Sequence, residues 1–255
     1  MTSITAELFG SKIGGYIGGL PSTAVVSFFF IGLTQSPQTA AQATEVFPLA
    51  YSITGLFLVC YAVFSRRGIV FALSGSISIW LLFSALIILF DLDNFLISLI
   101  AYVLIFIISY YLLEKRLKIP FTGRIKTKYK ALQILARAMS GGTIVAFAVL
   151  MSKVGGPIFG GIFSAFPAVF ISILIITYKS RGMNFSISMT KPLMKSGMLT
   201  VVAYGISVRY LYPSLGLILG TFGAYLISLM IALFLYILSI KMFPVTKKMP
   251  HTGEL

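Results

Sequence analysis

Residues 68–90 read GIVFALSGSISIWLLFSALIILF, a run without a charged side chain. A helix of about 20 apolar residues crosses the hydrocarbon core of a bilayer, whereas a buried helix of a soluble domain is shorter and carries a polar stripe. Similar runs recur along the chain, which is 58% hydrophobic and 10% charged, with a mean hydropathy of +0.99. A soluble domain needs far more surface charge. The sequence therefore predicts an all-α, polytopic integral membrane helical bundle.

We expect about eight transmembrane helices, joined mostly by short polar segments. The predicted spans cover residues 11–34, 46–64, 68–90, 94–113, 131–152, 154–178, 192–212 and 214–240. Glycine and proline mark two tight joints, KVGGP at 153–157 and Tyr212-Pro213-Ser214. The basic segment 114–130 is the one substantial hydrophilic connector. It divides the chain into an N-terminal half, 1–113, and a C-terminal half, 131–255.

The basic residues predict the orientation, because Lys and Arg collect on the cytoplasmic loops of membrane proteins. With a cytoplasmic N-terminus, Lys153 and Arg209 are the two of the 20 Lys and Arg residues that face outside. We therefore expect a multi-pass protein of the cell membrane with both termini in the cytoplasm. The same rule accounts for the net charge of +14, so nucleic acid is not an expected partner.

The two halves share a pattern of paired glycines followed by a proline. Residues 14–23 read GGYIGGLPST and residues 155–168 read GGPIFGGIFSAFPA. The offset between the halves is 141 at the first glycine pair, 146 at the prolines, 144 from Pro48 to Pro192 and 145 from Gly75 to Gly220. Three consecutive spans of each half then correspond. Because an odd number of crossings separates the first span from the sixth, the two copies are expected to be inverted in the membrane.

Inverted repeats with interrupted helices are typical of secondary transporters, whose substrate binds near the midplane. Glycine and proline lower the cost of leaving helical geometry, and amides at the start of the following half-helix can hold an anion. The residues expected to shape the two half-sites lie at the interruptions: Gly18, Gly19, Pro21, Ser22 and Thr23 in the first, and Gly160, Gly161, Phe166 and Pro167 in the second. The alternative is that these glycines serve only close helix packing.

Basic side chains near the spans are candidates for neutralising an anion. Arg137 comes shortly before a cluster of small and hydroxyl residues in the fifth span, and together they are a candidate anion cradle. The members of that cluster are Ser140, Gly141, Gly142 and Thr143. The alternative for Arg137 is that its side chain snorkels to the inner headgroups.

Lys195 and Arg209 share a face of the seventh span, about 21 Å apart along the helix axis. They are either anchors at the two membrane interfaces or part of a positively charged pathway through the bundle. Both residues are included among the candidate substrate-binding positions.

The chain offers little for acid–base or metal chemistry. It has six acidic residues and one histidine, His251, which lies beyond the last predicted span. Asp91 and Asp93 share a short outer loop, but a membrane-embedded transferase normally needs several carboxylates to hold magnesium. We therefore expect no enzyme activity, no metal and no cofactor, and keep the transferase as a second alternative.

The run from Gly155 to Ala168, with its two glycine pairs and Phe-Pro-Ala, resembles a motif of small prokaryotic membrane proteins of the GlpM-like type. The resemblance covers a short stretch of each half and implies nothing about a substrate. Residues 140–143 are also similar to a short element of polyprenyl-phosphate flippases, although the proline and acidic residue upstream in that element are absent here. This second resemblance points to phosphate-bearing lipids.

Together these features predict a secondary transporter or lipid flippase that moves a small or lipid-linked anion by alternating access at two broken helices. Its expected partners are membrane lipids and the anion, either a small molecule or a lipid phosphate, and a homo-oligomer is left open. The first alternative is an accessory or assembly subunit of a membrane complex, which would use the same glycines only for packing.

Overall fold

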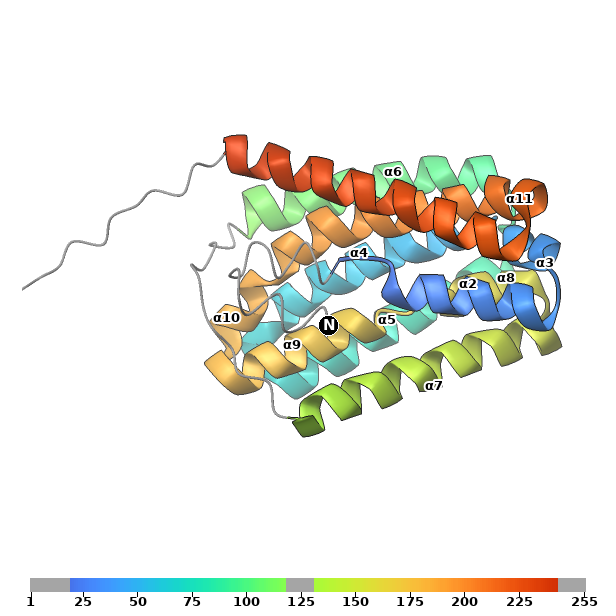
Figure 1. The fold of residues 1–255 in the computed structure, drawn as a ribbon. Coiled ribbons are helices and arrows are strands. Elements are labelled where there is room, and N and C mark those ends of the chain that lie inside the picture. Colours follow the sequence, from blue (N-terminus) through green and yellow to red (C-terminus); the bar gives the residue numbers. More distant parts are fainter. Residues whose placement is uncertain (1–18, 118–130, 243–255) are drawn as a thin grey trace, which may run out of the picture.

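The computed structural model of the protein describes residues 19–117 and 131–242, and every regular element in these ranges is helical. The helices lie side by side in one bundle (Figure 1). In chain order they are α2 (Ser22–Thr34), α3 (Pro37–Ala43), α4 (Phe47–Phe64), the 3-10 turn η1 (Ser65–Arg67), α5 (Ile69–Leu89), α6 (Phe95–Tyr111), the π-helical turn η2 (Leu112–Arg116), α7 (Ala131–Gly155), α8 (Pro157–Ser164), α9 (Ala168–Arg181), α10 (Met183–Ser188) and α11 (Thr190–Met242). The predicted all-α class is confirmed.

Several of these helices are long and apolar enough to cross a membrane. The stretches that meet both requirements have mean hydropathies between 1.8 and 2.5, and they are Phe47–Arg67, Ile69–Leu89, Phe95–Arg116, Pro157–Arg181 and Met183–Leu238. Of the first predicted span, 11–34, only the part from residue 19 is described, and its helix is α2. Long apolar helices support the predicted membrane protein.

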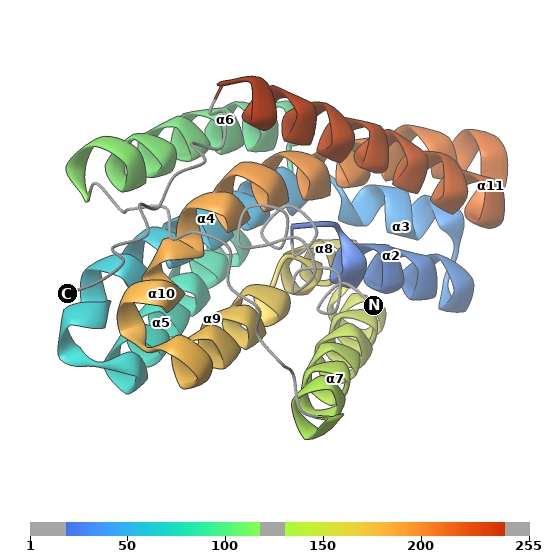
Figure 2. The same cartoon turned by 60° about the vertical axis from the view of Figure 1, so that its left-hand side comes forward.

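The centre of the bundle is α4, which is buried on nearly all sides between α11, α5 and α6 (Figure 2). A helix that is apolar all round is stable only when other helices or lipid cover it. By contrast, α5, α6 and the second part of α11 expose large apolar side chains such as Val70, Ile107 and Ile218. Those faces are suited to contact lipid.

The two ends of the bundle differ in charge. We name them the α3 end and the α10 end after the short helices there (Figure 1). The α10 end is the more basic of the two; it carries Arg66, Arg67, Lys115, Arg116, Lys179, Arg181 and Lys191. The α3 end carries three carboxylates and two basic side chains: Glu45, Asp91, Asp93, Lys153 and Arg209.

Glycines with positive φ make the sharp joints. Gly156, at φ 90°, separates α7 from α8, within the predicted KVGGP joint at 153–157. Gly216, at φ 75°, divides α11 into two helical stretches, 190–215 and 217–242. The predicted joint at Tyr212-Pro213-Ser214 is therefore misplaced by a few residues: Pro213 is accommodated inside the first stretch, and the chain turns at Gly216, where glycine avoids the steric cost of a side chain.

Candidate functional site

Two helices begin at a proline that follows an interruption of the helical backbone. The residue before α2 is Pro21, with φ −76° and ψ 44°, and the residue before α9 is Pro167, with φ −77° and ψ 39°. Proline fixes its own φ and has no amide to donate to a preceding turn, so it favours the start of a new helix. The two starts lie 146 positions apart in the sequence and have the same backbone conformation.

The hydrogen bonds across the two prolines are also the same. The amide of Ser22 donates to the carbonyl of Leu20 at 2.7 Å, and the amide of Ala168 donates to the carbonyl of Phe166 at 2.8 Å. A bond from residue i+2 to residue i closes a γ-type turn centred on each proline. We call the segments 19–21 and 165–167 the first and second breaks.

The glycine pair predicted to interrupt the sixth span lies before the break, inside α8. Gly161 packs against the carbonyl of Ala43 so closely that a Cβ would overlap it, and a Cβ on Gly160 would meet the side chain of Ser152 at 2.6 Å. The structure therefore places Gly160 and Gly161 in a helix-packing contact. The interruption itself comes at 165–167.

A threonine from the opposite half of the chain holds each break. The hydroxyl of Thr54, on α4, donates to the carbonyl of Ala165 at 2.8 Å, and the hydroxyl of Thr200, on α11, donates to the carbonyl of Gly19 at 2.6 Å. Both threonines are fully buried. A carbonyl released from a helix needs another donor where water is excluded, and these hydroxyls supply one.

These four residues repeat with the spacing of the prolines. Thr200 lies 146 positions after Thr54, and Ala165 lies 146 positions after Gly19. Each hydrogen bond is thus the counterpart of the other, with the two halves exchanged. Neither threonine is among the site residues expected from the sequence, although the two are hydroxyl residues separated by the same offset as the prolines.

A small cavity lies where the two breaks meet. Its volume is about 20 Å³, roughly the space for one water molecule. The lining residues come from both breaks and from the long helices beside them: Leu20, Thr23, Tyr51, Phe166, Pro167, Val169, Phe170 and Val201. Two pairs among them, Leu20 with Phe166 and Thr23 with Val169, again stand 146 positions apart. The predicted half-site residues Thr23, Phe166 and Pro167 are therefore brought together.

Two helix N-termini lie beside this cavity. Both α2 and α9 begin beside it, and neither has a side-chain cap or an acidic residue in its first turn among the described residues. The first amides of a helix carry a partial positive charge that attracts anions. Gly19 and Pro21 are buried at the first break, whereas Ser22 is exposed, and Gly18 lies outside the described residues.

The second predicted cluster lies elsewhere, on α7. Gly141 and Gly142 have open space where a Cβ would be, and the exposed hydroxyl of Thr143 donates to the carbonyl of Met139 in its own helix at 3.0 Å. The structure does not bring these residues to the breaks. The side chains of Arg137 and Ser140 lie outside those that the structure describes.

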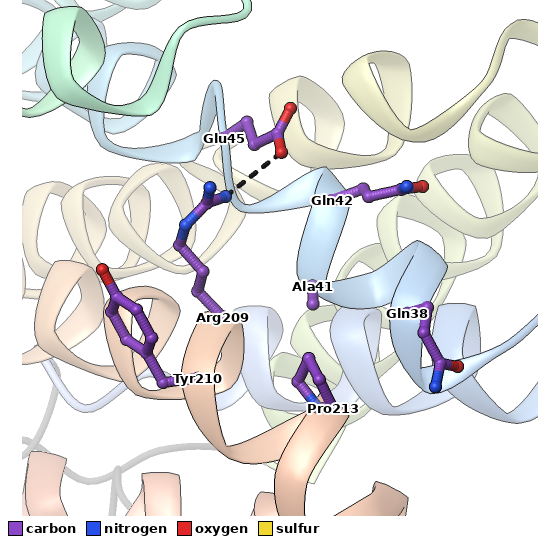
Figure 3. Close-up of a pocket in the computed structure, with 7 residues that line it drawn as sticks. All are labelled: Gln38, Ala41, Gln42, Glu45, Arg209, Tyr210 and Pro213. Atoms are coloured by element: carbon purple, nitrogen blue, oxygen red, sulfur yellow. Dashed lines mark hydrogen bonds and ion pairs between the residues drawn. The ribbon is translucent and has the colours of Figure 1, made fainter.

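Lys195 and Arg209 lie near opposite ends of the first stretch of α11, and neither lines the cavity between the breaks. The Lys195 ammonium is 5.2 Å from the ring centre of Tyr110. The Arg209 guanidinium is 4.4 Å from the ring centre of Phe95 and forms an ion pair with Glu45, in which Nη1 and Oε1 are 3.3 Å apart (Figure 3).

Comparison with known proteins gives one family match. Residues 134–248 match a family described as "Protein of unknown function (DUF3147)", a range that begins in α7 and extends past α11. No curated protein and no solved structure matches the chain. The similarity is thus to a poorly characterised family, as the sequence motif indicates, and the GlpM-like type is not confirmed.

Proposed function

We propose that this protein is a membrane transporter that moves a small anion by alternating access between two inverted repeats. The observation that supports this most is the pair of breaks with equal backbone angles, 146 residues apart, each held by a threonine of the other half. Unrelated packing contacts would have no reason to repeat at one spacing. A duplicated unit that meets its copy at broken helices is the architecture of many secondary transporters.

The directions of α2 and α9 support the inversion. From the first break, α2 leads to the α3 end of the bundle, and from the second break, α9 leads to the α10 end (Figure 1). In our proposal the bundle has eight spans, of which α2 belongs to the first, α8 and α9 form one and α11 forms two. The basic α10 end then faces the cytoplasm of a cell membrane, together with both termini.

The narrow cavity supports a gated pathway. A volume of about 20 Å³ admits no substrate larger than water, so passage requires the two halves to move relative to one another. Two helix starts beside the cavity favour an anion over a cation. That Arg137 neutralises the transported anion stays a prediction. A lipid-linked anion is the other substrate class that the transport test includes.

Flux into vesicles tests the proposal. The purified full chain is reconstituted in phosphatidylethanolamine–phosphatidylglycerol vesicles, and uptake of chloride, nitrate, phosphate and acetate is compared with movement of a fluorescent polyprenyl phosphate between leaflets. We expect at least one small anion to enter about tenfold faster than in protein-free vesicles, and Thr23→Trp to remove that flux by filling the cavity. The matched control is Leu219→Trp, on an exposed apolar face. Absence of flux for every probe would refute the transporter, and lipid movement alone would make it a flippase.

A further inference from the structure

A second and larger cavity opens at the α3 end of the bundle. It has a volume of about 350 Å³, within the range of small-molecule sites. It lies between α3 and the far end of the first stretch of α11, and its lining residues are Gln38, Ala41, Gln42, Glu45, Arg209, Tyr210 and Pro213 (Figure 3). We call this cavity the outer basin. Two carboxamides, a phenol and one ion pair are among the groups that line it.

Contacts with Phe95 and Glu45 hold the Arg209 guanidinium in place, and these two contacts do not use all of its N–H donors. Its guanidinium lies over the ring of Phe95, and in the described part of the chain only Nη1 is engaged by a carboxylate, that of Glu45 at 3.3 Å. The exposed fractions of the two side chains are 26% for Arg209 and 34% for Glu45. Ion pairs of this exposure are weak and readily exchanged. The planar guanidinium has further N–H donors in a fork that matches the two oxygens of a carboxylate or phosphate.

We propose that the outer basin captures a small oxyanion, a carboxylate or a phosphate, that takes the Arg209 guanidinium from Glu45. The aromatic ring of Phe95 keeps the guanidinium plane fixed while the carboxylate partner is exchanged, and Gln38 and Gln42 also line the basin. This inference rests on the proposed transport function only for what happens to the anion after it has bound. Binding itself is measurable without transport.

The opposite end of the bundle supports this assignment. The position equivalent to Glu45, 146 residues later, is Lys191, and it also carries an ion pair, with Glu114 at 2.9 Å. There the cation is only 6% exposed, whereas at the α3 end the pair faces the basin. Corresponding positions of the two halves thus carry ion pairs at opposite ends, with a buried cation in one pair and a cation that is 26% exposed in the other. The exposed cation, Arg209, is the one that an anion can reach.

Charge substitutions matched for sign and location test the basin. We measure binding of inorganic phosphate and of acetate to the purified full chain by calorimetry. Glu45→Gln removes the competing carboxylate and is expected to tighten binding about fivefold, whereas Arg209→Gln weakens it about tenfold, the value of roughly one charge-assisted hydrogen bond. Asp91→Asn and Lys153→Gln make the same charge changes at the same end outside the basin, and we expect less than about a twofold change from long-range charge alone.

The outcomes separate the two proposals. If Glu45→Gln binds like Asp91→Asn, or Arg209→Gln binds like Lys153→Gln, the outer basin is not the anion site, whatever the vesicles show. If binding follows the expected pattern but no anion crosses the vesicle membrane, the basin stands and the transporter fails. Arg209→Lys keeps the charge without the fork and is expected to fall between wild type and Arg209→Gln. The affinity of Arg209→Lys can be compared with that of the wild type even if Arg209→Gln does not fold.

Discussion

Valine at Thr54 or Thr200 is expected to slow anion transport by about tenfold in either variant, and by about a hundredfold in the double variant. Valine keeps the shape of threonine but cannot donate to the break carbonyl, Ala165 for Thr54 and Gly19 for Thr200. Hydrogen bonds between transmembrane helices contribute about 0.6–1.7 kcal/mol, and a tenfold change in rate corresponds to about 1.4 kcal/mol. The measurement is the initial rate of uptake per folded protein in vesicles.

The control for this loss is Thr177→Val. Thr177 is equally buried, but its hydroxyl donates to the carbonyl of Ile173 in its own helix, so it joins no two halves. Serine at position 54 or 200 retains the hydroxyl and is expected to restore most of the rate. Thr54→Val also removes the acceptor of the Trp80 indole N–H, at 3.2 Å, and is expected to be the slightly worse of the two. Wild-type rates in both valine variants would contradict a role for the breaks in transport.

Glu114→Gln is expected to lower the free energy of unfolding by about 2 kcal/mol, because the Lys191 ammonium loses its carboxylate partner. Breaking a buried ion pair by removing one partner costs about 3–5 kcal/mol, and we reduce the value because Glu114 is 31% exposed. The measurement is reversible denaturation in mixed detergent micelles. We expect Glu114→Gln to change the free energy of unfolding and not the amount of protein inserted into the membrane.

The converse variant has a smaller expected effect. Lys191→Met leaves a carboxylate that water reaches, so the cost should be about 1 kcal/mol, and the double variant Glu114→Gln/Lys191→Met should lie close to wild type. Lys179→Met changes the same charge at an exposed position of the same end and serves as the control. If Glu114→Gln is no more destabilised than Lys179→Met, the ion pair does not stabilise the folded protein.

The helical class was predictable from the sequence, because apolar runs of membrane-crossing length leave few alternatives. Joints were less well predicted. The sequence predicts a break at Pro213, yet the first stretch of α11 accommodates it, and the turn comes at Gly216, where the backbone needs positive φ. Local composition marks where a helix can stop, whereas tertiary packing decides which of several nearby signals is used.

The candidate site was only half predictable. Pro21 and Pro167 were identified from their shared pattern, and both stand at breaks. Thr54 and Thr200 were missed, because their partners lie 111 and 181 residues away and the sequence alignment of the halves used an offset of 144 in that span. The cluster at 141–143 is similar in composition but does not line the cavity between the breaks. Small and hydroxyl residues serve both packing and binding, and only their spatial neighbours separate the two roles.

The most direct measurement is the accessibility of the cavity between the two breaks to a reagent added on each side of the membrane. Cys60 is the single cysteine of the chain, so Cys60→Ala gives a background in which Thr23→Cys or Val169→Cys adds one thiol at the cavity. Vesicles of known orientation are treated with a membrane-impermeant thiol reagent on one side at a time, with Asp93→Cys and Lys179→Cys as markers for the two surfaces. We expect both cavity cysteines to react from either side, and more slowly when the transported anion is present. Cysteines that react from neither side, while both markers are labelled, would show that the breaks form a sealed packing contact and not a pathway.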